Sequence, residues 1–106
     1  MSDLILIQTS SDDRSLLERI ARQLVENRLA ACVQILGPAT SYFAWEGKVD
    51  TALEWICAIK TTRAAQPRVE AAISAAHNYS LPELVVLPIL GGSETYLNWV
   101  RDSVTP

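Results

Sequence analysis

Residues 48–62 (KVDTALEWICAIKTT) carry the longest alternating pattern in the chain. Apolar side chains recur on one face of this segment and charged side chains on the other, which is the period of a β-strand. Directly before it, Glu46-Gly47 has the residue types of a hairpin turn, and residues 41–45 (SYFAW) continue the extended pattern on the other side. The sequence therefore predicts a long β-hairpin that turns at Glu46-Gly47.

This hairpin is too long for a domain of 106 residues. A strand over residues 48–62 would measure about 50 Å at the usual rise per residue, whereas a domain of this size is only about 35 Å across. The hairpin must therefore extend beyond its own domain, and apolar side chains near its tip would form a large exposed patch. We expect a second chain to cover this patch, which consists of Phe43, Trp45, Val49 and Leu53.

The rest of the chain predicts two helices, three further strands and a short last helix. Strands are expected over residues 4–9, 29–36 and 83–90, with Gly37-Pro38 bending or interrupting the second and Pro88 favouring an edge or a bulge in the third. Helices are expected over residues 13–27, after the N-cap candidates Ser11, Asp12 and Asp13, and over residues 63–77. A short helix capped by Ser93 should bury Tyr96, Leu97 and Val100.

The order strand, helix, strand, strand, helix, strand defines the expected fold class. It predicts an α+β protein of the ferredoxin-like split βαβ type, with an antiparallel sheet and both main helices on one face. A long β-hairpin and a C-terminal helix are added to this sandwich. Residues 1–106 are expected to form one domain.

Composition excludes several classes of partner. Nine basic against twelve acidic side chains give a net charge of −3, without the clustered basic stripe of a nucleic-acid-binding protein. No apolar run approaches the ~18 residues of a membrane span, and the first residues lack the basic region of a signal peptide. The sequence therefore predicts a cytoplasmic protein that binds neither nucleic acid nor membrane.

His77 is the only histidine, and three roles are open for it. It can cap a helix end or bond a carbonyl, contact a metal weakly, or transfer a proton. Cys32 and Cys57 form no CxxC motif, and pairing about the turn places Cys57 opposite Leu36, so the two sulfurs are ~13 Å apart along the strands. Because a transition metal usually needs two to four such ligands in one place, a site with His77 and Cys32 requires neighbouring subunits.

Glu83, beside Pro82, is a second candidate site residue. It can form an ion pair with Lys60 or Arg68 across an interface, line a cleft with Tyr79, or remain exposed at the start of a strand. Tyr79, Glu83 and Lys60 are the candidate ligand-binding residues. Since the chain has no nucleophile elbow and no phosphate-binding glycine loop, it is not expected to be an enzyme.

Several motifs together resemble the CutA divalent-cation tolerance family over essentially the whole chain. They are NRLAACVQI, SYFAWEGKVD, EWICAIKTT, HNYSLPELVVLPI and YLNWV. The resemblance implies a ferredoxin-like homotrimer with its hairpins in the subunit interfaces, similar in fold to the PII-type signalling proteins. It also implies tolerance of copper and other divalent metals, while animal members of the family are described as helping to assemble or anchor other proteins.

The chain departs from the family pattern at residues associated with metal. The usual HPYE appears as His77-Asn78-Tyr79-Ser80, and Gln8 and Ala76 stand where some members have a cysteine and a second histidine. We therefore expect no required cofactor, and only weak binding of copper or another divalent cation at intersubunit sites. The alternative is a PII-like signalling or scaffold module that binds a small ligand or a partner protein at intersubunit clefts.

Overall fold

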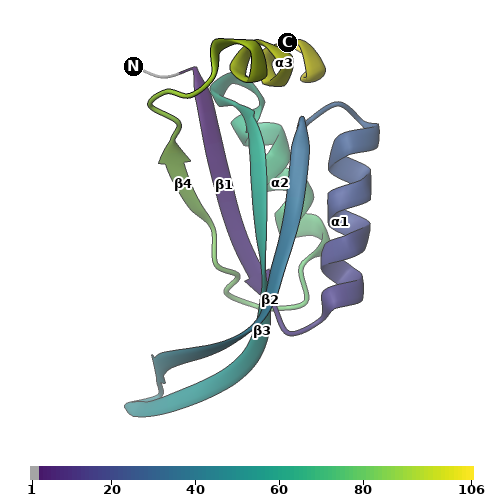
Figure 1. Ribbon diagram of the computed structural model, residues 1–106. Coiled ribbons are helices and arrows are strands. Elements are labelled where there is room, and N and C mark those ends of the chain that lie inside the picture. The colour runs from purple at the N-terminus through teal and green to yellow at the C-terminus, as the bar shows by residue number, and fades with distance from the viewer. Residues whose placement is uncertain (1–2) are drawn as a thin grey trace.

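A computed structural model describes residues 3–106 of the chain (Figure 1). Its elements follow in the order β1 (Leu4–Ser11), α1 (Arg14–Glu26), β2 (Cys32–Trp45), β3 (Lys48–Thr62), a 3-10 helix (Arg63–Ala65), α2 (Gln66–Ala76), β4 (Val85–Pro88) and α3 (Glu94–Ser103). The four strands form one sheet in the order β2-β3-β1-β4, and all neighbours are antiparallel. The predicted α+β class with an antiparallel sheet is confirmed.

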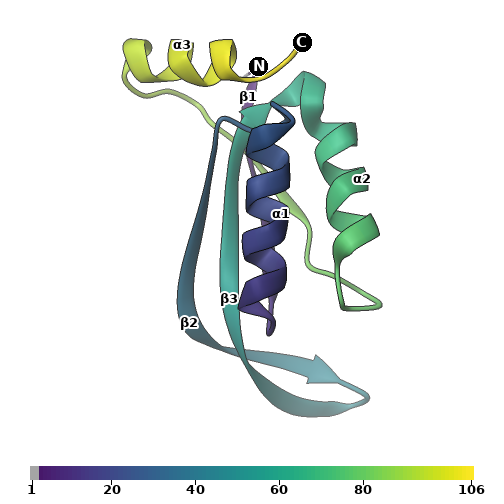
Figure 2. The same cartoon turned by 90° about the vertical axis from the view of Figure 1, so that its right-hand side faces the viewer.

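One hydrophobic core lies between the sheet and the pair α1 and α2, which cover the same face (Figure 2). Asp13 caps α1 by accepting a hydrogen bond of 3.1 Å from the backbone N–H of Leu16. The buried side of α1 repeats at helical spacing, and the sheet supplies apolar side chains from β1 and β3. The largest buried side chains of this core are Leu17, Ile20 and Leu24 from α1, Ile5, Ile7 and Ile59 from the sheet, and Val69 and Ile73 from α2.

Helix α3 lies across the end of the sheet where β1 begins (Figure 1). Ser93 caps it as predicted, with its hydroxyl accepting from the N–H of Tyr96 at 3.2 Å, and Val100 is buried. Tyr96, however, is 40% exposed, so its expected burial is wrong for the single chain. The reason is its position, because a helix at the end of a sheet turns only a narrow stripe of side chains toward the core. None of the helices of residues 3–106 is long and apolar enough to cross a membrane.

The strand boundaries differ from the expected ones in two places. Strand β2 begins at Cys32 instead of residue 29 and is continuous to Trp45, and Gly37-Pro38 bends it as a bulge, which was one of the two effects expected of this pair. The bulge shifts the register by one position, so Cys57 lies opposite Ile35. Strand β4 is shorter than expected, at Val85–Pro88, and lies at the edge of the sheet, as Pro88 predicts.

Beyond the bulge, β2 and β3 leave the sheet as a two-stranded arm. We call residues 39–54 the hairpin arm. Strand β1 ends at Ser11, opposite Trp55, so no third strand continues alongside the arm. The molecule is 45 Å long but only 25 × 22 Å across, and the arm curves below the sheet and α1 in Figure 2. Val49 is 78% exposed, Leu53 56% and Trp45 50%, which confirms that the hairpin extends beyond the domain with apolar side chains uncovered.

Gly37 makes the bulge possible. Its φ of +137° is rarely adopted by residues with a side chain, and an added Cβ would lie 3.0 Å from Cδ1 of Trp55 and 3.1 Å from the carbonyl oxygen of Glu54. A glycine is therefore required where the arm leaves the sheet.

We predict that Gly37→Ala lowers the free energy of unfolding by about 1–3 kcal/mol, because it forces an unfavourable backbone conformation and a close contact. Gly91→Ala is the matched control, since its added Cβ meets nothing within 4 Å. Denaturant unfolding of both variants at equal protein concentration measures the difference. Equal stabilities would show that the bulge accepts a side chain.

Candidate functional site

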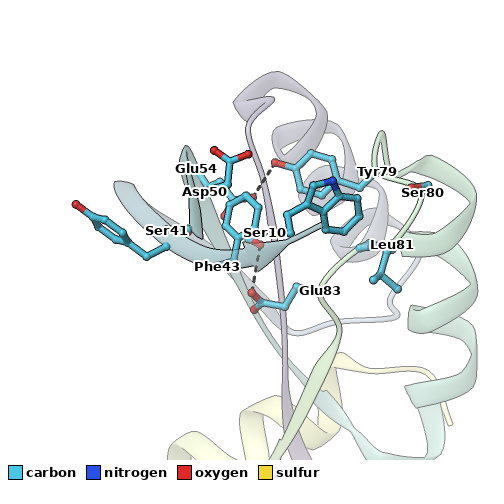
Figure 3. A pocket seen from close by; sticks show the side chains of 12 residues that line it. Ser10, Ser41, Phe43, Asp50, Glu54, Tyr79, Ser80, Leu81 and Glu83 are labelled. Atoms are coloured by element: carbon cyan, nitrogen blue, oxygen red, sulfur yellow. Dashed lines mark hydrogen bonds between the residues drawn. The ribbon is translucent and has the colours of Figure 1, made fainter. Parts of the chain in front are cut away.

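A cleft of 780 Å³ opens between the hairpin arm and the loop that follows α2 (Figure 3). Three segments line it: the end of β1, the arm, and the loop over residues 79–83. Their lining residues are Ser10, Ser41, Tyr42, Phe43, Trp45, Asp50, Glu54, Tyr79, Ser80, Leu81, Pro82 and Glu83. The structure thus brings together residues that the sequence assigned to two different roles. Phe43 and Trp45 were expected in the subunit interface, and Tyr79 and Glu83 were expected to bind a ligand.

His77 fixes the loop at the base of this cleft. Its Nε2 lies 2.7 Å from the carbonyl oxygen of Ser10, and its Nδ1 accepts a hydrogen bond of 3.0 Å from the backbone N–H of Tyr79. Since Nδ1 accepts, this network assigns the proton to Nε2, which donates to Ser10. His77 thus bonds a carbonyl, the structural role among the three that the sequence left open, and both ring nitrogens have partners.

Tyr79 connects the loop to the hairpin arm. Its hydroxyl donates to Oε2 of Glu54 at 2.7 Å (Figure 3). The same hydroxyl accepts from the backbone N–H of Asp12 at 2.9 Å. Burial and the hydrogen bond to Glu54 raise the pKa of the Tyr79 phenol well above its ordinary value, so the hydroxyl keeps its proton as a donor. The side chain of Tyr79 therefore holds the carboxylate of Glu54 in place.

Glu54 is the site residue that sequence reasoning missed. The alternation of residues 48–62 placed it on the face of the strand that carries the charged side chains. In the structure Glu54 is only 8% exposed, because the chain bends at the neighbouring bulge and the Tyr79 loop covers it. The one signal for this in the sequence was its place beside the Gly37-Pro38 interruption in the paired strand.

Glu83 lines the cleft with Tyr79, which was one of its three expected arrangements. Its Oε2 accepts from Nε2 of Gln8 at 3.0 Å and its Oε1 from the hydroxyl of Ser10 at 3.2 Å. Lys60 lies elsewhere: its Nζ is 3.3 Å from the hydroxyl of Tyr96 and 5.3 Å from the centre of that ring. The predicted set of Tyr79, Glu83 and Lys60 is therefore not assembled within one chain.

The two cysteines are unpaired and lie apart from His77. Cys57 is fully buried, and burial raises the pKa of its thiol to about 11. Cys32 is partly exposed opposite Lys60, whereas His77 contacts Ser10, which is paired with Ile56. These levels of β3 are about 13 Å apart, so one chain does not bring Cys32 and His77 together. Across residues 3–106, no group of three or more His, Cys, Asp or Glu side chains is placed to hold a metal ion.

The cleft is acidic. Asp50, Glu54 and Glu83 line it, while no lysine, arginine or histidine is among its lining residues. The ion pairs of the described part of the chain lie elsewhere, at Arg14–Glu18, Arg22–Glu26 and Arg101–Asp3. The site therefore presents negative charge beside aromatic side chains.

The fold and site define a small α+β protein with a protruding hairpin and an acidic cleft at its base. The family model of the CutA1 divalent ion tolerance protein matches residues 5–103 of the chain. The chain belongs to the CutA1 divalent ion tolerance family, which confirms the resemblance carried by its sequence motifs.

Individual relatives agree with this assignment. The divalent-cation tolerance protein CutA of Thermus thermophilus is 40% identical over 103 residues, which is 97% of this chain and 98% of that protein. The chloroplastic protein CutA of Arabidopsis thaliana is 35% identical over 93% of this chain, which spans 54% of that longer protein. The crystal structure of CutA1 from Shewanella sp. SIB1 superposes with a TM-score of 0.95 at 34% identity, covering 99% of this chain and 98% of that one.

The names of relatives do not support one cellular location. They include the chloroplastic Arabidopsis protein and a periplasmic divalent cation tolerance protein from Archaeoglobus fulgidus. The cytoplasmic location of this chain stays a prediction.

We predict that His77→Ala lowers the free energy of unfolding by about 1–3 kcal/mol, because the Ser10 carbonyl and the Tyr79 N–H lose their shared partner. Ser80→Ala, an exposed change in the same loop, should be nearly neutral. Thermal unfolding of the two variants measures the effect. If His77→Ala unfolds like the unaltered protein, the imidazole does not hold the loop.

Proposed function

We propose that this chain is a non-enzymatic protein of divalent-metal tolerance that acts as a homotrimer of ferredoxin-like subunits. It binds copper or another divalent cation weakly, at sites that need more than one subunit. Membership of the CutA1 divalent ion tolerance family carries this proposal. The proposal of a non-enzymatic role is supported by His77, whose ring nitrogens both bond the backbone, and by the buried thiol of Cys57.

Assembly is supported by the exposed apolar side chains of the hairpin arm. Trp45, Val49 and Leu53 are at least half exposed in the single chain, and burying each contributes about 1.5–3 kcal/mol. In a symmetric oligomer this gain is repeated in every subunit. The arm has no covering element of its own, so a neighbouring subunit is its natural partner.

Weak metal binding is supported by the partners that the candidate ligands already have. A metal at His77 must displace either the Ser10 carbonyl or the Tyr79 N–H from the ring. Cys32 can complete such a site only from a neighbouring subunit. A metal ion is therefore not needed for the fold, unlike a structural zinc, whose binding energy is folding energy.

We predict a trimer mass by light scattering, and we predict that Trp45→Asp or Leu53→Asp disrupts it, because a charge replaces an apolar side chain in the interface. Val25→Asp is the control, since Val25 is 44% exposed but lies on α1. A monomer mass for the unaltered protein at micromolar concentration would contradict the proposal. An intact trimer for both Trp45→Asp and Leu53→Asp would place the interface outside the arm.

We predict stoichiometric Cu²⁺ or Zn²⁺ binding by calorimetry, with a dissociation constant below about 1 mM. It should weaken in His77→Ala and also in Cys32→Ser, which leaves the hydrogen bonds of His77 intact. Exhaustive EDTA treatment should preserve the trimer and its melting temperature. A decrease of more than about 10 °C on chelation would reveal a structural metal site.

The cleft favours a second candidate function, a signalling or scaffold module that binds a small ligand or a partner protein where subunits meet. Its volume of 780 Å³ falls in the range of small-molecule sites, and the arm that forms one wall is the proposed interface. Absence of metal binding below about 1 mM would favour this candidate over the first.

A further inference from the structure

Glu54 is a nearly buried acidic residue that forms no ion pair with the described residues. Its residue is 8% exposed, and its partner among residues 3–106 is the neutral hydroxyl of Tyr79, on Oε2. Carboxylates are rarely buried to this extent unless a cation pairs with them, because the lost hydration costs several kcal/mol. Since none of the three ion pairs in the described chain includes Glu54, a cation from outside the chain would balance it.

The surroundings of Glu54 fit an organic cation better than a bare metal ion. A hard divalent cation takes about six to eight oxygen ligands. Here three carboxylates line the cleft, and no group of three or more His, Cys, Asp or Glu side chains among residues 3–106 is placed to hold a metal ion. The remaining walls are largely aromatic and apolar, including Phe43 and Trp45. Aromatic faces attract organic cations by cation–π contact but supply no metal ligands.

Both carboxylates are held in place before any ligand binds. Tyr79 fixes Glu54 from the loop, and Gln8 and Ser10 fix Glu83 from β1. His77 in turn fixes the loop to β1. Because these side chains are already ordered, binding costs less conformational entropy. A small ligand that makes few contacts can therefore still bind.

We propose that the cleft binds a small organic cation with a primary ammonium group. The ammonium donates to the open Oε1 of Glu54 and lies near the carboxylates of Asp50 and Glu83, while its carbon skeleton packs against Phe43 and Trp45. A primary ammonium is chosen over a quaternary one because it can donate an N–H hydrogen bond to Oε1. This inference rests on the second candidate function and gives the chemical class of its ligand.

Calorimetric titration with 2-phenylethylammonium tests the proposal, and 2-phenylethanol is the uncharged probe of similar shape. We expect the ammonium to bind in the cleft and the alcohol to bind at least about tenfold more weakly, since its charge-assisted hydrogen bond is missing. Glu54→Gln keeps an acceptor for Tyr79 but removes the charge, so binding should weaken by about tenfold or more. Phe43→Leu keeps an apolar wall without the aromatic face and should weaken the ammonium by a few-fold, about the strength of one cation–π contact.

Glu46→Gln is the matched control, because it removes a carboxylate from the hairpin turn outside the cleft lining. It should bind like the unaltered protein, and light scattering and thermal unfolding of every variant show whether fold and assembly are retained. Ammonium binding that is absent, equal to that of the alcohol, or unchanged in Glu54→Gln would overturn the proposal.

A crystal structure of the assembled protein provides an independent test. A lysine or arginine of a neighbouring subunit bonded to Glu54 would also overturn the proposal, because the counter-charge would then come from the protein itself. Neither the titration with 2-phenylethylammonium nor the crystal structure depends on the mass measured by light scattering or on the Cu²⁺ titration. Failure of this inference is therefore distinguishable from failure of the proposed functions.

Discussion

The shape of the molecule depends on the residue at which strand β1 ends. Ser11 is the last residue of β1 and pairs with Trp55, and from there outward β3 pairs with β2 alone. A two-stranded ribbon has no core of its own and is marginal in water without a covering partner. The same point sets the elongated shape, the exposed apolar arm and the cleft beneath it. The bulge at Gly37-Pro38 lies at this point too, and it directs the arm toward the loop of Tyr79.

Much of this arrangement could be predicted from the sequence because it depends on local periodicity and length. The alternation over residues 48–62 identified β3 at its observed boundaries, and comparing its length with the size of the domain predicted the protruding arm. Asp13 was among the cap candidates for α1 and is the cap. Motifs distributed along the chain identified the family.

The environment of Glu54 could not be predicted in this way. Periodicity places a residue on one of the two faces of a straight strand. The bulge at Gly37-Pro38, however, bends the paired strands β2 and β3 beside Glu54. Its partner Tyr79 lies 25 positions away in sequence, in a loop whose path is set by the bond between His77 and Ser10. Tyr96 illustrates the same limit, since helical spacing alone does not tell how much of a terminal helix the sheet can cover. Long-range contacts decided both cases.

Gln8 also gains a role that its residue type alone did not indicate. The family resemblance implies a cysteine at this position in some members, and glutamine supplies no thiolate for a soft metal. Gln8 instead donates to Glu83 and orients one of the acidic side chains of the cleft. Likewise His77, the only imidazole, is used to hold the loop that carries Tyr79. Residues at positions associated with metal in the family therefore help to shape the acidic cleft in this chain.

The position of the cleft connects ligand binding with assembly. One wall belongs to the sheet and its loop, whereas the other belongs to the hairpin arm, whose exposed apolar residues form the interface that we propose. A ligand that binds only when both walls are in place stabilises the assembled state by RT ln(1 + [L]/Kd). By the same linkage, assembly must raise the affinity for that ligand, because the coupling between two binding equilibria is reciprocal. Tyr79 bridges the two walls through Glu54, so this one carboxylate would connect the proposed ligand with the position of the arm.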